Sequence, residues 1–327
     1  MTTPHTTAGA KVKNFFGRLD PLIVLIISAV LVTIVLPARG EFAEHFSLAT
    51  KLAIALLFFL YGARLSPQEA LAGLKHWRLH LTILAFTYAV FPLIGVALRP
   101  LHLVLGMPLY LGILYLTLVP STVQSSVAFT SIARGNVAGA IVSASASNLI
   151  GVVLTPVLVM ITMGGSVTLS PKIFADIAIQ LLLPFVVGQL LRPLVKDFAK
   201  NKATKLVDRG SITMVVYSTF SAGMVEGIWG TVRPLELLGL VVLAVLLVGF
   251  MLWLTRAVAR WLKFSDADVK AIQFCGTKKS LATGLPMAAV IFGGANLGLL
   301  ILPLMIFHQV QLMMCSFLAG RYAKQLD

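Results

Sequence analysis

Apolar runs of roughly 20 residues follow one another along almost the whole chain, and they constrain the fold most strongly. Of the 327 residues, 58% are hydrophobic and only 12% are charged, whereas a soluble domain carries about 25% charged residues. A soluble fold of this size could not cover so much apolar surface. We therefore expect an all-α integral membrane protein, because helices satisfy their own backbone hydrogen bonds inside a bilayer.

Ten of these runs are long enough to cross a membrane. The predicted spans are 21–37, 47–65, 79–98, 108–132, 137–162, 173–192, 210–230, 236–258, 268–293 and 297–320. Alternate connections, together with the span ends beside them, hold 19 of the 26 lysines and arginines, and the other connections and span ends hold five. This bias predicts that both termini lie in the cytoplasm. The expected location is the bacterial inner membrane.

The ten spans divide into two sets of five. We expect a cytoplasmic N-terminal tail at 1–20, a first five-helix repeat at 21–162, a connector at 163–172, a second repeat at 173–320 and a C-terminal tail at 321–327. An odd number of spans in each half inserts the second half upside down relative to the first. That inverted repeat is typical of many secondary transporters.

Two polar segments interrupt the apolar runs at corresponding places in the two halves. VPSTVQSSVAFT begins at Val119, and GTKKSLATG begins at Gly276. Pro120 and Gly276 both weaken a helix, so each segment is expected to break its span and expose amides, carbonyls and a half-helix dipole. The alternative is a simple kink in which Ser and Thr bond to the preceding turn. Overlaid, the segments match Thr122 with Thr277, Gln124 with Lys279 and Ser125 with Ser280.

Lys278 and Lys279 stand out because a charge near the bilayer centre costs roughly 3 kcal/mol or more. Both lie eight or nine residues beyond Lys270, well inside the predicted span, so their ammonium groups cannot readily reach the interface. Consecutive residues of a helix point about 100° apart. One lysine is expected to face a cavity and the other a neighbouring helix, with the assignment left open.

The candidate binding residues follow from these segments and from two further polar side chains. Asn148 lies within reach of the breaks if the two halves cross, and His308 is either a proton-active group or a hydrogen-bonded packing residue. The predicted substrate- or ion-binding residues are Ser121, Thr122, Gln124, Ser125, Ser126, Asn148, Thr277, Lys278, Lys279, Ser280 and His308.

Other function classes find little support in the sequence. HExxH, GxSxG and P-loop motifs are absent, so neither an enzyme nor an ATP-driven pump is expected. The two cysteines, Cys275 and Cys315, lie in apolar segments and predict neither a disulfide framework nor a metal site. The net charge of +14 comes from short loops, which the positive-inside bias explains without nucleic-acid binding.

Four segments resemble the bile acid:sodium symporter family, in its divergent SBF-like branch. They are YGARLSPQEALAGL, VPSTVQSSVAFTSIARGN, ASASNLIGVVLTP and FCGTKKSLATGLPMA, and the resemblance covers nearly all of the chain after the N-terminal tail. It implies that spans one, two, six and seven form a panel, and that broken helices four and nine cross in a core. It also implies alternating-access transport of organic anions, typically with sodium.

The chain departs from the sodium-coupled members at their sodium positions. Their Ser-Asn pair becomes Ser125 and Ser126, a glutamate becomes Phe274, and a Gln-Asn pair becomes Lys278 and Lys279. An ammonium repels sodium, so we hypothesise that one lysine takes the place of a bound cation. It would then carry a proton or pair with the anionic substrate.

Several alternatives stay open at this stage. No cofactor is expected, although ordinary sodium:organic anion symport remains an alternative. A non-transporting regulatory membrane protein with a transporter fold is another. The expected partners are a small organic anion and membrane lipid. The sequence leaves open whether the protein forms a homo-oligomer.

Overall fold

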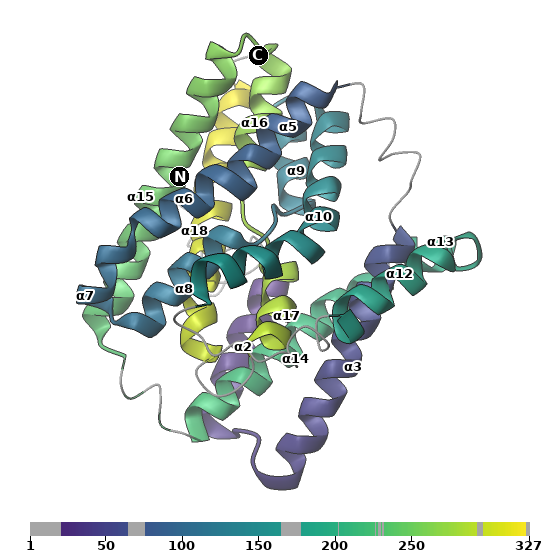
Figure 1. The fold of residues 1–327 in the computed structure, drawn as a ribbon, viewed down its shortest axis with the longest axis vertical. Helices are drawn as coiled ribbons and strands as arrows, with labels where there is room; N and C mark the ends of the chain where they lie inside the picture. The colour runs from purple at the N-terminus through teal and green to yellow at the C-terminus, as the bar shows by residue number, and fades with distance from the viewer. Residues whose placement is uncertain are drawn as a thin grey trace, which may run out of the picture.

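The computed structural model describes residues 21–64, 76–164, 178–201, 203–225, 227, 230, 232–292 and 297–324, and every regular element in these ranges is helical. The predicted N-terminal tail, most of the connector and the end of the C-terminal tail lie outside the described residues. Figure 1 shows the helices with the labels used below.

The first half of the chain forms long helices interrupted by short turns. They are α2 (Pro21–Val35), α3 (Gly40–Arg64), α5 (Trp77–Ala85), η2 (Phe86–Val90), α6 (Phe91–Ala97), η3 (Arg99–Leu101), α7 (His102–Leu105), α8 (Met107–Leu118), α9 (Gln124–Ile132) and α10 (Val137–Met163). The η2 segment is a single π turn inside the otherwise continuous helix from Trp77 to Ala97.

The second half of the chain also consists of helices separated by short turns. Its described elements are η4 (Ala178–Leu182), α12 (Leu183–Leu190), α13 (Arg192–Lys200), α14 (Thr204–Val225), α15 (Pro234–Trp261), α16 (Asp266–Thr277), α17 (Leu281–Ile291) and α18 (Leu297–Lys324).

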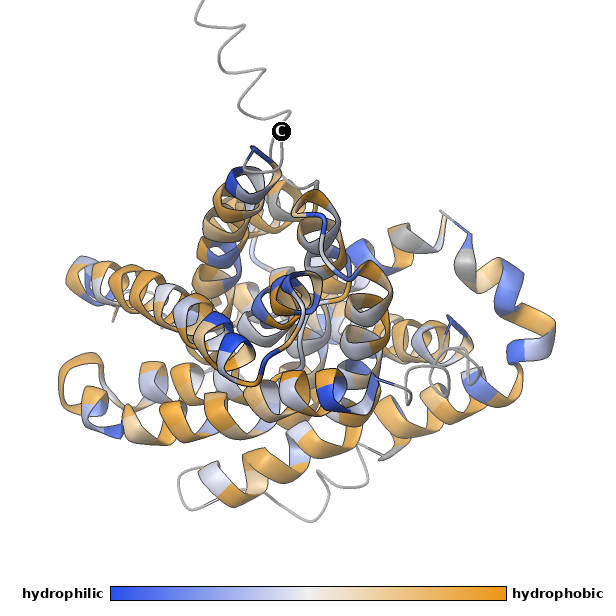
Figure 2. Ribbon diagram, turned by 90° about the horizontal axis from the view of Figure 1, so that it is seen from above, coloured by the Kyte–Doolittle hydropathy of each residue, from blue (hydrophilic) through white to orange (hydrophobic). Residues whose placement is uncertain are grey.

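Within the described residues, five helices are long and apolar enough to cross a membrane: Gly40–Arg64, Trp77–Ala97, Val137–Met163, Pro234–Trp261 and Leu297–Lys324. A sixth is added if the pair formed by α12 and α13, which bends by 103°, counts as one span. Figure 2 shows apolar residues over most of the helices, with polar residues toward helix ends and inside the bundle. The chain is therefore an all-helical, multi-span integral membrane protein.

Some helices extend beyond the predicted spans because a helix need not end where the apolar run ends. The predicted span 47–65 begins earlier, at Gly40, and 210–230 begins earlier, at Thr204. The charged stretch after residue 192 contains α13, whose Leu194 and Phe198 are exposed apolar side chains. Loop charge locates a membrane boundary, but it does not locate the end of a helix.

The helices pack in two groups. In one group α3 lies against α12, α13 and α14, and α2 lies against α14. In the other group α15, α16 and α18 pack together, with α5, α8, α9 and α10 around them. The groups lie at different ends of the view in Figure 1 and meet where α14 contacts α17 and α18.

Glycines let α3 and α12 approach closely. A Cβ atom at Gly62 would overlap the carbonyl oxygen of Phe185, and one at Gly188 would overlap that of Phe59. Small residues at such crossings allow backbone contact, which replaces the hydrophobic driving force that is missing between helices in lipid.

Gly62→Ala is expected to lower the free energy of unfolding by about 1–3 kcal/mol, because the added methyl group forces α3 and α12 apart. Gly210→Ala is the matched control, since nothing lies within 4 Å of a Cβ there. The control should be neutral or up to about 1 kcal/mol more stable, as alanine favours a helix. Thermal unfolding in detergent measures the melting temperatures of the two variants. Equal melting temperatures would contradict the close crossing of α3 and α12.

Candidate functional site

Both predicted helix breaks are present, and they touch. The first break (residues 119–123) separates α8 from α9, and the second break (residues 278–280) separates α16 from α17. The Ser280 amide donates a 2.8 Å hydrogen bond to the carbonyl of Pro120. Segments about 160 positions apart in the sequence therefore meet backbone to backbone in the middle of the bundle.

The Lys279 ammonium binds three backbone carbonyls that the helix geometry leaves open. Its Nζ atom lies 2.8 Å from the oxygen of Thr87, 2.7 Å from that of Thr117 and 2.9 Å from that of Val119. Thr117 lies in the last turn of α8, and Val119 is the C-cap residue directly after that helix. Thr87 belongs to the π turn η2. Three acceptors match the three N–H donors of an ammonium group.

Neighbouring carbonyls at the first break also have hydrogen-bond donors. Thr155 donates from its hydroxyl to the Leu118 carbonyl at 2.9 Å, and the Asn148 amide donates to the Ser121 carbonyl at 2.7 Å. Together with the Lys279 and Ser280 contacts, every carbonyl from residue 117 to 121 has a donor. The unwound backbone is thus stable away from water, where each unpaired group would cost several kcal/mol.

A glutamine on α18 holds the second break. The Gln311 side chain accepts from the Lys279 amide and donates to the Lys279 carbonyl, each at 2.8 Å. Its Nε2 atom also lies 2.8 Å from His308 Nδ1. These contacts fix the extended backbone that turns Lys279 toward α8.

Ser121 of the first break and Ser126 of α9 pair with the end of α16. The Ser121 hydroxyl donates to the Cys275 carbonyl at 2.6 Å, and the Ser126 hydroxyl donates to the Phe274 carbonyl at 3.4 Å. Each broken helix therefore satisfies part of the other's backbone.

Lys278 differs from its neighbour. Its side chain is fully buried, yet Nζ has no hydrogen-bond partner among the described residues. The atom lies 3.7 Å from the centre of the Phe129 ring, a cation–π distance. Lys279 Nζ also lies near a ring, 4.3 Å from the centre of Phe91, so the two adjacent lysines differ in that only Lys279 is hydrogen-bonded to carbonyls.

A cavity of about 820 Å³ extends from the breaks toward the group that contains α3 and α14. Its lining combines polar side chains of the breaks with apolar side chains of the surrounding helices. The residues are Leu22, Tyr61, Arg64, Thr122, Val123, Gln124, Ser125, Ala128, Phe129, Ser145, Asn148, Leu149, Val152, Phe185, Asp208, Arg209, Ser280, Leu281, Ala282, Thr283, His308, Gln309, Leu312, Met313 and Ser316. We refer to it as the central cavity.

The N-termini of α9 and α17 both begin at the wall of the central cavity. Gln124 and Ser125 open α9, and Leu281 and Ala282 open α17. The first turn of a helix presents unpaired N–H groups and a partial positive charge. Val123 supplies no side-chain cap to α9, whereas Ser280 caps α17 through the Thr283 amide. The arrangement favours negative charge at this wall.

The structure divides the predicted binding residues into two sets. Six of them line the central cavity: Thr122, Gln124, Ser125, Asn148, Ser280 and His308. Five are buried among the helices and do not line it: Ser121, Ser126, Thr277, Lys278 and Lys279. Neither lysine faces the central cavity in this conformation, and Phe129 lies between Lys278 and that space.

Other residues at the site were not among the predicted set. Arg64 pairs with Asp208 at 2.8 Å on the cavity wall, and Arg209 lies beside them. The two arginines counted only toward the basic charge beside the membrane, and no local signal placed any of the three residues in a cavity. Gln311 had a signal, since it lies one helical turn from His308 in an apolar span, but its contact with a helix break depends on tertiary structure.

Residues 20–324 match the model of the SBF-like CPA transporter family. The chain belongs to this family. It therefore belongs to a family of transporters and not to a family of enzymes, and the resemblance drawn from the four segments is confirmed.

Its relatives match over most of their length. An uncharacterized protein of Pseudomonas aeruginosa is 48% identical over 313 residues, or 94% of each chain. The Escherichia coli protein named "Putative symporter YfeH" is 46% identical over 324 residues, or 96% of each chain. Sodium/bile acid cotransporter 7 of Rattus norvegicus is 32% identical over 274 residues, covering 82% of this chain and 81% of its own.

Methionine keeps the approximate length of a lysine side chain and removes its charge. Replacing each of the two lysines by methionine should therefore change the stability of the protein differently. Lys279→Met leaves three buried carbonyls without a donor, so the free energy of unfolding should fall by at least about 3 kcal/mol. Lys278→Met removes a buried group without a hydrogen-bond partner, so stability should stay the same or rise. Thermal unfolding of both variants in detergent tests this contrast. A larger loss for Lys278→Met would contradict the assignment.

Proposed function

We propose that the protein is a secondary active transporter that moves a small organic anion by alternating access. It would contain ten spans in two inverted repeats, at 21–162 and 173–320, with both termini in the cytoplasm of a bacterial inner membrane. The observation that carries the proposal is the contact between two broken helices, whose C-terminal halves, α9 and α17, begin at the wall of one cavity. Broken helices at the interface of repeats are typical of transporter substrate sites.

The central cavity suits an anion with an apolar part. The first turns of α9 and α17 supply amides, and Gln124, Ser125 and Ser280 supply polar side chains. Arg209 adds a positive charge that has no ion pair among the described residues, whereas Arg64 is neutralised by Asp208. Leu149, Val152, Leu281, Leu312 and Met313 provide the apolar wall. A volume of about 820 Å³ lies within the usual range for small-molecule sites.

The position of the central cavity supports alternating access. Its lining comes from both helix groups, with Tyr61 and Arg64 on α3, Asp208 and Arg209 on α14, and the remainder mostly on the group with the breaks. Movement of the α3 and α14 group, the proposed panel, against the proposed core would therefore change access to the breaks. The Arg64–Asp208 pair joins two helices of the panel, so it can persist during that movement.

We propose that lysine side chains of the protein take the place of sodium in coupling anion transport to an ion gradient. The Lys279 ammonium already fills a cage of three carbonyls, which is the kind of oxygen site that a bound cation would need. Lys278, buried behind Phe129, is the proposed proton carrier. Ordinary sodium symport remains the alternative, favoured by the relative named as a sodium/bile acid cotransporter. A regulatory protein that does not transport is the other alternative.

Thermal stabilisation tests the anion site directly. Purified protein is screened against small carboxylates and sulfonates, each beside its neutral amide analogue. Anions should raise the melting temperature and the amides should not. Arg209→Gln should weaken the apparent affinity about tenfold by removing one charged contact. Lys324→Gln, at the exposed end of α18, is the matched control. If no anion stabilises the protein, or if Arg209→Gln binds as the wild type does, the site assignment is wrong.

Proteoliposomes loaded with the best-binding anion test the coupling. Uptake is expected to follow a pH gradient and to be the same in sodium and potassium. Lys278→Met should bind the anion but lose the response to the pH gradient, while Lys324→Gln keeps it. Uptake that requires sodium in the wild type would overturn the lysine mechanism and leave sodium symport in its place. Binding without any uptake would favour the regulatory alternative.

A further inference from the structure

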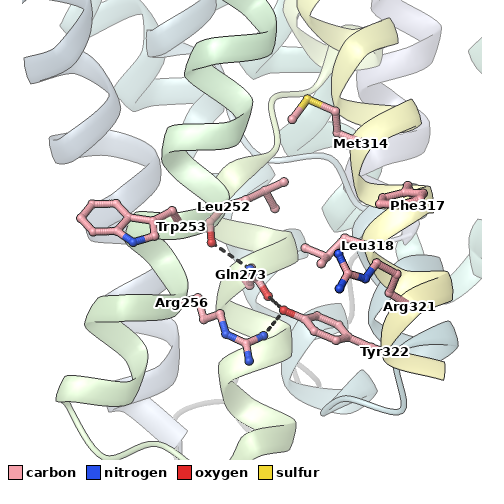
Figure 3. A pocket seen from close by; sticks show the side chains of 9 residues that line it. All are labelled: Leu252, Trp253, Arg256, Gln273, Met314, Phe317, Leu318, Arg321 and Tyr322. Atoms are coloured by element: carbon pink, nitrogen blue, oxygen red, sulfur yellow. Dashed lines mark hydrogen bonds between the residues drawn. The ribbon is translucent and has the colours of Figure 1, made fainter. Parts of the chain in front are cut away.

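A second cavity of about 470 Å³ lies between α15, α16 and α18, and it shares no lining residue with the central cavity. Figure 3 shows its nine side chains. They are Leu252, Trp253, Arg256, Gln273, Met314, Phe317, Leu318, Arg321 and Tyr322. Nothing in the proposed transport mechanism uses these side chains.

A hydrogen-bonded chain builds its polar wall. The Gln273 side chain donates to the Leu252 carbonyl and accepts from the Tyr322 hydroxyl, each at 2.8 Å. The Arg256 guanidinium donates to the Tyr322 hydroxyl and lies 5.1 Å from the centre of that ring. Gln273 and Tyr322 are buried, so the chain holds Arg256 in a defined position at the cavity.

The cavity carries uncompensated positive charge. Arg256 comes from α15 and Arg321 from α18, and both reach into the same space beside Tyr322 in Figure 3. Neither arginine forms an ion pair among the described residues, and no acidic side chain lines the cavity. The neighbouring acid Asp266 is paired with Lys270 at 2.7 Å. Two guanidinium groups without a carboxylate are suited to a phosphate group.

The rim of the cavity is apolar and faces outward. Trp253 is 63% exposed and Phe317 is 70% exposed, on two helices that are long enough to cross a membrane. An exposed tryptophan and phenylalanine on such helices lie against lipid. Both arginines lie near the C-terminal ends of their helices, beside Arg260 and Lys324, at the end that loop charge assigns to the cytoplasm. The cavity thus joins a cationic polar wall to a hydrocarbon-facing surface.

We propose that this cavity binds the headgroup of an anionic phospholipid from the cytoplasmic leaflet. The phosphate lies between Arg256 and Arg321, and an acyl chain lies along Trp253 and Phe317. Basic pockets between membrane helices on the cytoplasmic side are typical sites for such headgroups. A free anion would use the two arginines but not the aromatic rim, which is why a lipid is the better match.

Quenching of tryptophan fluorescence by brominated lipid tests the site. The protein is reconstituted in phosphatidylcholine vesicles that contain a small fraction of either brominated phosphatidylglycerol or brominated phosphatidylcholine. Subtracting the signal of Trp253→Phe isolates Trp253. Brominated phosphatidylglycerol should quench Trp253 more strongly at the same fraction, and unlabelled phosphatidylglycerol should reverse the quenching. Equal quenching by both lipids would overturn the proposal.

Arg321→Gln and Arg256→Gln should each weaken phosphatidylglycerol binding about fivefold. Arg260→Gln is the control, because Arg260 is an exposed arginine at the same end of α15 that does not line the cavity. Arg321 makes no hydrogen bond among the described residues, so its variant should unfold at the wild-type temperature in phosphatidylcholine. Unchanged binding by Arg321→Gln, or an equal loss in Arg260→Gln, would contradict the site. Reversal of quenching by inorganic phosphate alone would show a soluble-anion site instead.

Discussion

Unwound backbone inside a membrane must find hydrogen-bond partners within the protein, and this structure depends on how that need is met. Lys279 supplies three donors to carbonyls of η2 and of the C-terminal end of α8. Gln311 holds the backbone of Lys279 itself from α18. One charged side chain therefore joins three segments of the chain around the two breaks. Without such a group, the first break would leave carbonyls unpaired in an apolar interior, at a cost that a helix avoids.

This arrangement gives two adjacent lysines different surroundings. The extended backbone of the second break lets Lys279 turn toward α8, while Lys278 lies against Phe129. The Lys279 ammonium is held by three carbonyls, whereas Lys278 Nζ has no hydrogen-bond partner among the described residues. In our account, the first replaces a bound metal ion and the second responds to protons. In the proposed mechanism the substrate occupies neither position and binds at the helix N-termini in the central cavity.

The sequence allowed much of this framework to be predicted. Pro120, Gly276 and the clustered hydroxyls mark both breaks, and apolar runs separated by basic loops mark a membrane protein. The partners of the lysines could not be predicted in the same way. The helix rule that placed them 100° apart does not apply to extended backbone, and the acceptor at Thr87 arises from a π turn. Arg64 and Arg209 counted only toward the basic charge beside the membrane, and Asp208 was not singled out, because only the packing of α3 on α14 brings them to the cavity.

The position of the Lys279 ammonium tests the account most directly. Solid-state NMR on protein labelled with ¹⁵Nζ-lysine and ¹³C-carbonyl threonine, in lipid bilayers, measures whether a lysine nitrogen lies beside threonine carbonyls. The account predicts one strongly coupled lysine signal, from contacts to Thr87 and Thr117 at 2.8 and 2.7 Å, that disappears in Lys279→Met. If no lysine signal couples to threonine carbonyls, or if the coupled signal survives that substitution, Lys279 does not hold the breaks together.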